Sequence, residues 1–100
     1  TDTEGVMQDV HWPHGIFGYF PTYSLGALAA AQLFAAATRA DADILPGLAR
    51  GDFKPLYAWL QVNIRDQGCL LMPDALIEQA TGTPLATAAY RASVTARYLA

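Results

Sequence analysis

The stretch SLGALAAAQLFAAATRA, residues 24–40, constrains the fold more than any other part of this 100-residue chain. We predict a helix from about Pro21 to Ala40, because Ala, Leu and Gln are strong helix formers and proline suits a first helical turn. Leu25 and Leu28 fall on one face, while Phe34 and several alanines fall on the opposite face. A helix that is apolar on every side is normally buried. The few helices of this chain should find such burial difficult.

The composition indicates that some apolar surface meets a partner. Hydrophobic residues make up 53% of the chain and charged residues 15%, well below the usual quarter. We expect the partner to be a second copy, in a homo-oligomer such as a homodimer, or a missing part of the same polypeptide. The net charge of −3 argues against nucleic-acid binding, which needs clustered Lys and Arg. The longest apolar run, residues 25–37, is shorter than the roughly 20 residues that span a bilayer.

The helical pattern predicts an all-α fold of four to five helices in a single segment, 1–100, with an irregular part over 1–20 and helices over 21–100. No window has the alternation of a strand. Beyond the first helix we expect four features, in chain order: a short turn from Asp43 that Pro46-Gly47 interrupts, a helix from an Asp52 N-cap to Gly68, a short helix from Pro73 to Gly82, and a final helix capped by Thr83.

Cys69 is the one cysteine of the chain. An internal disulfide is therefore impossible, and a reducing compartment such as the cytoplasm is the default location. The surrounding letters QGCLL contain no histidine that could activate a thiolate. We expect a buried or half-buried structural thiol.

Most of the side-chain chemistry lies in the opening segment GVMQDVHWPHGIFGYFPTY, residues 5–23. One interpretation is a metal site formed by His11, His14 and Asp9. Pro13 argues against it, because it interrupts the helix that would place both imidazoles on one face. A catalytic zinc also needs a third ligand and an ordered second shell.

A second interpretation makes the segment the wall of an active site. Tyr19 and Tyr23 are four residues apart and bracket the helix start, where backbone N–H groups favour an anion such as a carboxylate. A tyrosine hydroxyl can also donate a hydrogen bond to a developing oxyanion. A third interpretation is purely structural, with Trp12, Phe17 and Phe20 in a core. The residues alone leave the wall and the core nearly equal.

The same segment resembles a known family. GVMQDVHW fits the G-x-x-Q-D-x-H-W motif of the M32 metallocarboxypeptidases, the thermostable carboxypeptidase Taq type. The continuation HGIFGYFPTYSLG, the following AAQLF and the later ATGTPL are also similar to that family. The resemblance covers essentially the whole chain.

The resemblance implies a C-terminal portion of a larger, mostly helical enzyme that removes single amino acids from peptide C-termini. The family uses zinc or another divalent metal, held by a His-Glu-x-x-His helix and a later Glu. This chain has no H-E-x-x-H, and its only glutamates are Glu4 and Glu78. We therefore expect it to bind no metal and to be inactive without the remainder of the same polypeptide. The alternative is a non-catalytic helical module for dimerisation or protein interaction.

The resemblance also implies roles for seven residues. Tyr19 and Tyr23 match the family's tyrosines, one to stabilise the tetrahedral oxyanion and the other to hold the substrate's C-terminal carboxylate, in an order that the sequence does not assign. The implied substrate-binding residues of the groove are Gln8, Asp9, His11, Trp12 and His14.

Overall fold

The computed structural model describes residues 1, 3–5 and 10–99. This part of the chain is helical and contains no strand, as predicted. The five α-helices are α1 (Pro21–Ala40), α2 (Ile44–Ala49), α3 (Lys54–Leu60), α4 (Pro73–Thr81) and α5 (Ala88–Val94). Two π-helical turns extend α3 and α5: η2 (Gln61–Arg65) and η3 (Thr95–Leu99).

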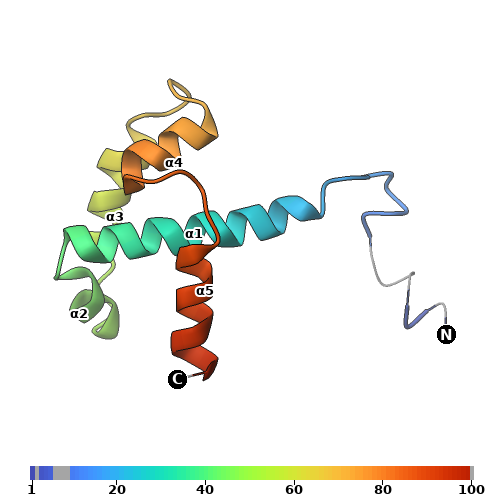
Figure 1. Ribbon diagram of the computed structural model, residues 1–100, viewed down its shortest axis with the longest axis horizontal. Coiled ribbons are helices and arrows are strands. Elements are labelled where there is room, and N and C mark those ends of the chain that lie inside the picture. The colour runs from blue at the N-terminus through green and yellow to red at the C-terminus, as the bar shows by residue number, and fades with distance from the viewer. Residues whose placement is uncertain (2, 6–9, 100) are drawn as a thin grey trace.

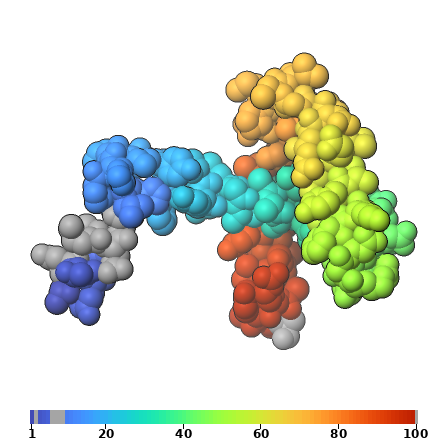
Figure 2. All heavy atoms as spheres, turned by 180° about the vertical axis from the view of Figure 1, so that it is seen from behind, coloured from blue at the N-terminus to red at the C-terminus, as the bar shows by residue number. Residues whose placement is uncertain are grey.

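Helix α1 is the axis on which the other elements are arranged (Figure 1). Its bounds are those predicted from the alanine-rich stretch. It contacts each of the other four α-helices. Helices α2 and α3 gather near its C-terminal end, while α4 and α5 lie on different sides of it (Figure 1). The N-terminal half of α1 and residues 10–20 before it project away from this group (Figure 2).

The chain encloses little of its apolar surface. Its accessible surface is 7478 Å², whereas a compact protein of 10.7 kDa exposes about 5500 Å². The radius of gyration is 17.0 Å, against about 13 Å for a compact domain of this length. Among the described residues, the buried apolar core consists of Ala36, Ala37 and Ile44. The expected difficulty of burying α1 is therefore real: Leu25 is 52% exposed and Phe34 42%.

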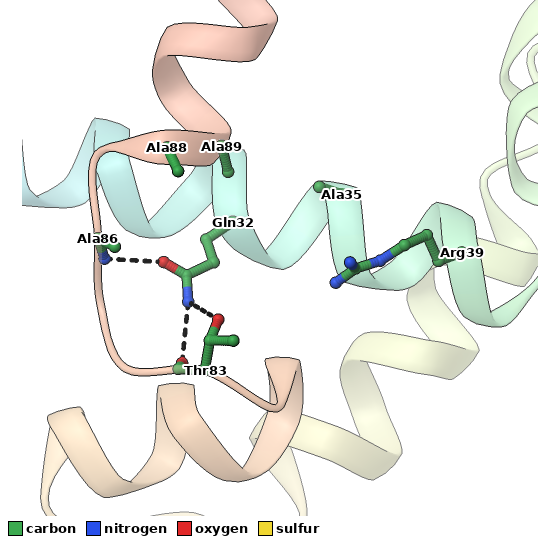
Figure 3. A pocket seen from close by; sticks show the side chains of 7 residues that line it. All are labelled: Gln32, Ala35, Arg39, Thr83, Ala86, Ala88 and Ala89. Carbon is green, nitrogen blue, oxygen red and sulfur yellow. Dashed lines mark hydrogen bonds between the residues drawn. The ribbon is translucent and has the colours of Figure 1, made fainter.

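Gln32 is the buried polar side chain at the centre of the arrangement, and it is 5% exposed. Its Nε2 lies 2.9 Å from the carbonyl oxygens of Thr83 and Pro84 and 3.0 Å from the hydroxyls of Thr81 and Thr83. Its Oε1 accepts a hydrogen bond from the N–H of Ala86 at 3.0 Å. The side chain thus ties α1 to the segment that joins α4 to α5 (Figure 3).

This contact explains why the predicted start of the last helix is wrong. Neither Thr83 nor Pro84 begins it; α5 starts at Ala88, and Thr87 occupies the N-cap position. The backbone groups of residues 83–86 face the Gln32 carboxamide, which satisfies them in a non-helical conformation. A local capping pattern could not predict a bond that reaches back 51 residues.

The predicted interruption at Pro46-Gly47 is also wrong, because both residues lie inside α2. Proline is tolerated there because N–H groups in the first helical turn have no intrahelical acceptor to lose. Gly47 is required for a different reason. A Cβ at this position would lie 2.9 Å from the carbonyl oxygen of Asp52, so the chain between α2 and α3 can close only over a glycine.

The middle of the chain follows the prediction more closely. The Asp52 carboxylate accepts a hydrogen bond from the N–H of Lys54 at 3.1 Å, although Phe53 takes the N-cap position of α3. Gly82 ends α4 in the left-handed conformation, with φ +82°. Cys69 departs from expectation: it is exposed, because its turn between η2 and α4 is covered by no described residue. No helix in the described ranges combines the length and apolar character needed to cross a bilayer.

Replacing Gln32 should destabilise this chain. Gln32→Leu keeps a similar side-chain size and removes all the hydrogen bonds of the carboxamide. A typical hydrogen bond contributes about 0.5–1.5 kcal/mol to stability, and the substitution removes several. We expect the free energy of unfolding, measured by urea titration with circular dichroism, to fall by at least about 2 kcal/mol.

Gln61→Leu is the matched control, since its amide bonds only the exposed carboxylate of Asp66. That change should alter the free energy of unfolding by less than about 0.5 kcal/mol. Equal losses in the two variants would contradict the role assigned to Gln32.

Candidate functional site

Residues 10–18 of the opening segment form tight turns before α1. The N–H of Gly15 donates to the carbonyl of Trp12 at 3.0 Å, and that of Ile16 donates to the carbonyl of His11 at 2.9 Å. Gly15 and Gly18 have φ of +69° and +74°, values that favour glycine. These turns bring residue 11 back to the start of α1.

The two tyrosines are placed by the first turn of α1. Phe20 is the N-cap residue and Pro21 follows it. The N–H of Tyr23 donates to the carbonyl of Phe20 at 3.2 Å, and the hydroxyl of Thr22 donates to the carbonyl of Tyr19 at 2.6 Å. Both tyrosines are therefore anchored through their backbone at one end of a twenty-residue helix.

His11 joins this pair in an aromatic cluster, which we define as His11, Tyr19, Phe20 and Tyr23. The His11 ring stacks on Tyr19 at 5.7 Å between centroids and meets Tyr23 edge-on at 5.9 Å. Tyr19 and Tyr23 are 5.6 Å apart. Phe20 contacts both His11, at 5.4 Å, and Tyr23, at 5.8 Å. All these spacings lie in the favourable range for aromatic pairs.

The environment of the cluster suits an anion or a hydrogen-bond acceptor. The N-cap residue Phe20 makes no side-chain hydrogen bond to the start of α1, and the first turn of the helix contains no acidic residue. The N–H groups of that turn and the positive end of the helix dipole therefore favour negative charge. The tyrosine hydroxyls at the same end of the helix are hydrogen-bond donors.

The other predicted site residues are arranged differently. Trp12 packs edge-on against Phe17 at 5.4 Å, outside the aromatic cluster. His14 is exposed, and its backbone N–H donates to the carbonyl of Val10 at 3.3 Å. Gln8 and Asp9 lie outside the described residues. Among the described residues, the structure thus unites His11, Tyr19 and Tyr23, whereas Trp12 and His14 make no ring contact with these three.

A shallow hollow of about 480 Å³ borders the cluster. It is lined by His11, Trp12, Phe20, Pro21 and Ser24. Sequence reasoning did not assign the last three of these to the site. All three lie between the two tyrosines in the sequence or directly beside them. This proximity could have identified them as site residues.

The structural interpretation, in which the aromatic side chains form a core, is not what this chain shows by itself, because these side chains are exposed. Trp12 is 56% exposed, Phe17 71% and Phe20 58%. The metal interpretation stays untested, because its third ligand, Asp9, lies outside the described residues; within them, no group of three His, Cys, Asp or Glu side chains could hold an ion. In this chain the aromatic side chains of the segment form an exposed surface.

Comparisons with known proteins agree on one family. Residues 1–98 match the family described as carboxypeptidase Taq (M32) metallopeptidase. The chain is 42% identical over 97 residues to Thermostable carboxypeptidase 1 of Thermus thermophilus, covering 97% of this chain and 19% of that protein. It is 42% identical over 85 residues to Carboxypeptidase 1 of Bacillus subtilis, covering 85% of this chain and 17% of that protein.

Solved structures give the same result. The fold superposes on Trypanosoma cruzi metallocarboxypeptidase 1 with a TM-score of 0.92 and 41% identity, covering all of this chain and 21% of that one. The chain therefore spans about a fifth of the length of the relatives it matches.

The chain alone should hold no stoichiometric zinc. After incubation with zinc and dialysis, we expect metal analysis to find far less than one ion per chain, because the described residues offer no third ligand beside His11 and His14. Chelation should leave the far-ultraviolet circular dichroism unchanged. One bound zinc that is lost in a His14→Ala variant would restore the metal interpretation.

Proposed function

Because this chain belongs to the carboxypeptidase Taq (M32) metallopeptidase family, we propose that it forms part of a zinc-dependent metallocarboxypeptidase. The complete enzyme removes single amino acids from peptide C-termini in the cytoplasm. This chain supplies part of the substrate groove and is inactive alone. The observation that carries the proposal is the convergence of His11, Tyr19 and Tyr23 at the start of α1, within the motif segment that resembles the family.

The tyrosine hydroxyls can stabilise the negative charge that develops during peptide hydrolysis. When water attacks the carbonyl carbon, the carbonyl oxygen becomes a tetrahedral oxyanion. A preorganised hydroxyl stabilises this charge without having to reorient during the reaction. The second tyrosine hydroxyl and the N–H groups at the start of α1 suit the substrate's terminal carboxylate. We assign these two tasks to Tyr19 and Tyr23 jointly, because both rings belong to one cluster.

The groove residues have supporting roles in the proposal. His11 and Trp12 border the hollow beside the tyrosines, where a peptide side chain could lie. His14 is exposed on the same turn and is available to a peptide backbone. We also assign Gln8 and Asp9 to the groove, on the sequence motif alone.

The proposal places the metal elsewhere in the polypeptide, because the sequence of this chain contains no H-E-x-x-H. The proposal therefore requires that motif in the part of the enzyme outside this chain. A full-length reading frame without it would contradict the proposal and favour the alternative, a non-catalytic interaction module.

Loss of the oxyanion donor should slow catalysis in the full-length enzyme. We expect either Tyr19→Phe or Tyr23→Phe to lower kcat by roughly 10²- to 10³-fold, the typical effect of one oxyanion donor. Zinc content should not change. Tyr98→Phe is the matched control, because Tyr98 lies on η3 and is 70% exposed. Unchanged turnover in both Tyr19→Phe and Tyr23→Phe would make these residues packing groups.

The exposed apolar surface supports a second part of the proposal. The chain exposes 7478 Å², about 2000 Å² more than a compact protein of its mass. A stable interface of standard size buries about 1600 Å². We propose that the remainder of the same polypeptide covers this surface in the enzyme. When the chain is isolated, we propose that further copies of the chain cover the surface in a homo-oligomer.

The isolated chain should therefore associate. Light scattering coupled to size-exclusion chromatography should give a dimer or larger species, because desolvating Leu25 and Phe34 is favourable. Leu25→Glu should shift the population towards monomer, whereas Gln79→Glu on the exposed face of α4 should not. A strictly monomeric parent chain would contradict this expectation.

A further inference from the structure

His11 occupies a distinctive position in the opening segment. Among residues 10–20 it is the one that is half-buried, whereas every other residue of that range is exposed. The larger rings of Trp12 and Phe17 are both more than half exposed. His11 is therefore the least exposed residue of residues 10–20.

The rings that cover His11 include both tyrosines proposed to act on the substrate. The centroids of His11, Tyr19 and Tyr23 form a triangle with sides of 5.7, 5.9 and 5.6 Å. His11 is nearly parallel to Tyr19, at 25°, and nearly perpendicular to Tyr23, at 77°. One imidazole thus contacts two phenol rings at once, one stacked and one edge-on.

The contact also joins two separate elements. His11 sits on the turn closed by the hydrogen bond from the Ile16 N–H to its own carbonyl, at 2.9 Å. Tyr23 belongs to α1, and Tyr19 immediately precedes its N-cap. The two tyrosines are 47% and 57% exposed. In the described residues, the rings that contact them are those of His11 and Phe20 and their own two rings.

From this geometry we infer that His11 is a positioning residue, whose ring holds Tyr19 and Tyr23 at the spacing and tilt that catalysis needs. The inference rests on the proposed function of the two tyrosines. It assigns the imidazole a task beyond substrate contact. The hydroxyl lies at the far end of each phenol ring, so a small tilt of the ring displaces it most.

The aromatic shape of the side chain carries this role. A phenyl ring can make the same stacked and edge-on contacts, whereas a methyl group cannot. The polar atoms of the imidazole matter for any direct contact with substrate. The two roles therefore respond differently to the same substitutions.

The experiment compares His11→Ala and His11→Phe in the full-length enzyme, with a blocked peptide as substrate. We expect His11→Ala to lower kcat by roughly 10²-fold, the scale of loss for a misplacement of about 1 Å. His11→Phe should recover kcat to within about tenfold of the unmodified enzyme, while KM rises if the imidazole also contacts substrate. Equal loss of kcat in the two variants would overturn the inference.

A double-mutant cycle adds a readout that general destabilisation does not move. His11→Ala is combined with whichever of Tyr19→Phe and Tyr23→Phe lowers kcat more. If His11 acts through that tyrosine, the double variant should be little slower than the tyrosine variant alone. Losses of kcat that simply multiply would overturn the inference.

The same variants separate this inference from the proposed function. Fluorotyrosine incorporated at residues 19 and 23 reports ring environment by nuclear magnetic resonance without any need for activity. We expect both signals to shift towards the value of unfolded chain in His11→Ala and to remain near their parent positions in His11→Phe. An inactive parent enzyme with this pattern would refute the carboxypeptidase proposal alone. Unshifted signals in His11→Ala would refute the positioning role.

Discussion

The five hydrogen-bonding contacts of Gln32 hold the helical group of this chain together. Helix α1 offers mostly alanine side chains to its neighbours, and small side chains bury little area when they pack. The carboxamide compensates with directed bonds to the backbone of residues 83–86. These bonds satisfy backbone groups of residues 83, 84 and 86 in an irregular segment. The carboxamide thus joins α1 to the segment between α4 and α5 (Figure 3).

The local elements could be predicted from the sequence because their causes are local. The alanine-rich run with Pro21 fixed the bounds of α1, and Gly82 fixed the end of α4. The start of α5 could not be predicted from Thr83 and Pro84, because a side chain 51 residues away determines that conformation. The exposure of Cys69 was missed for a related reason: burial depends on what covers a turn, and no local pattern contains that information.

The proximity of Tyr19 and Tyr23 could be predicted from the sequence, whereas the approach of His11 to them could not. The spacing of Tyr19 and Tyr23 indicated that they would lie together at a helix start. The convergence of His11 on them depends on two turns, whose glycines adopt positive φ at residues 15 and 18. A sequence shows that such glycines permit a turn; it does not show where the turn directs the next ring. The mutual contact of the His11, Tyr19 and Tyr23 rings was therefore found only in the structure.

The long separation of the Gln32 contacts has a consequence for the order of folding. The helical propensity of α1 is local, so its backbone can form quickly once the residues are present. Its contacts with residues 83–86 close loops of about fifty residues, and the entropy of closing a loop must be overcome before the contact contributes anything. Helix α1 can therefore form early in folding, whereas its contacts with the segment between α4 and α5 form late.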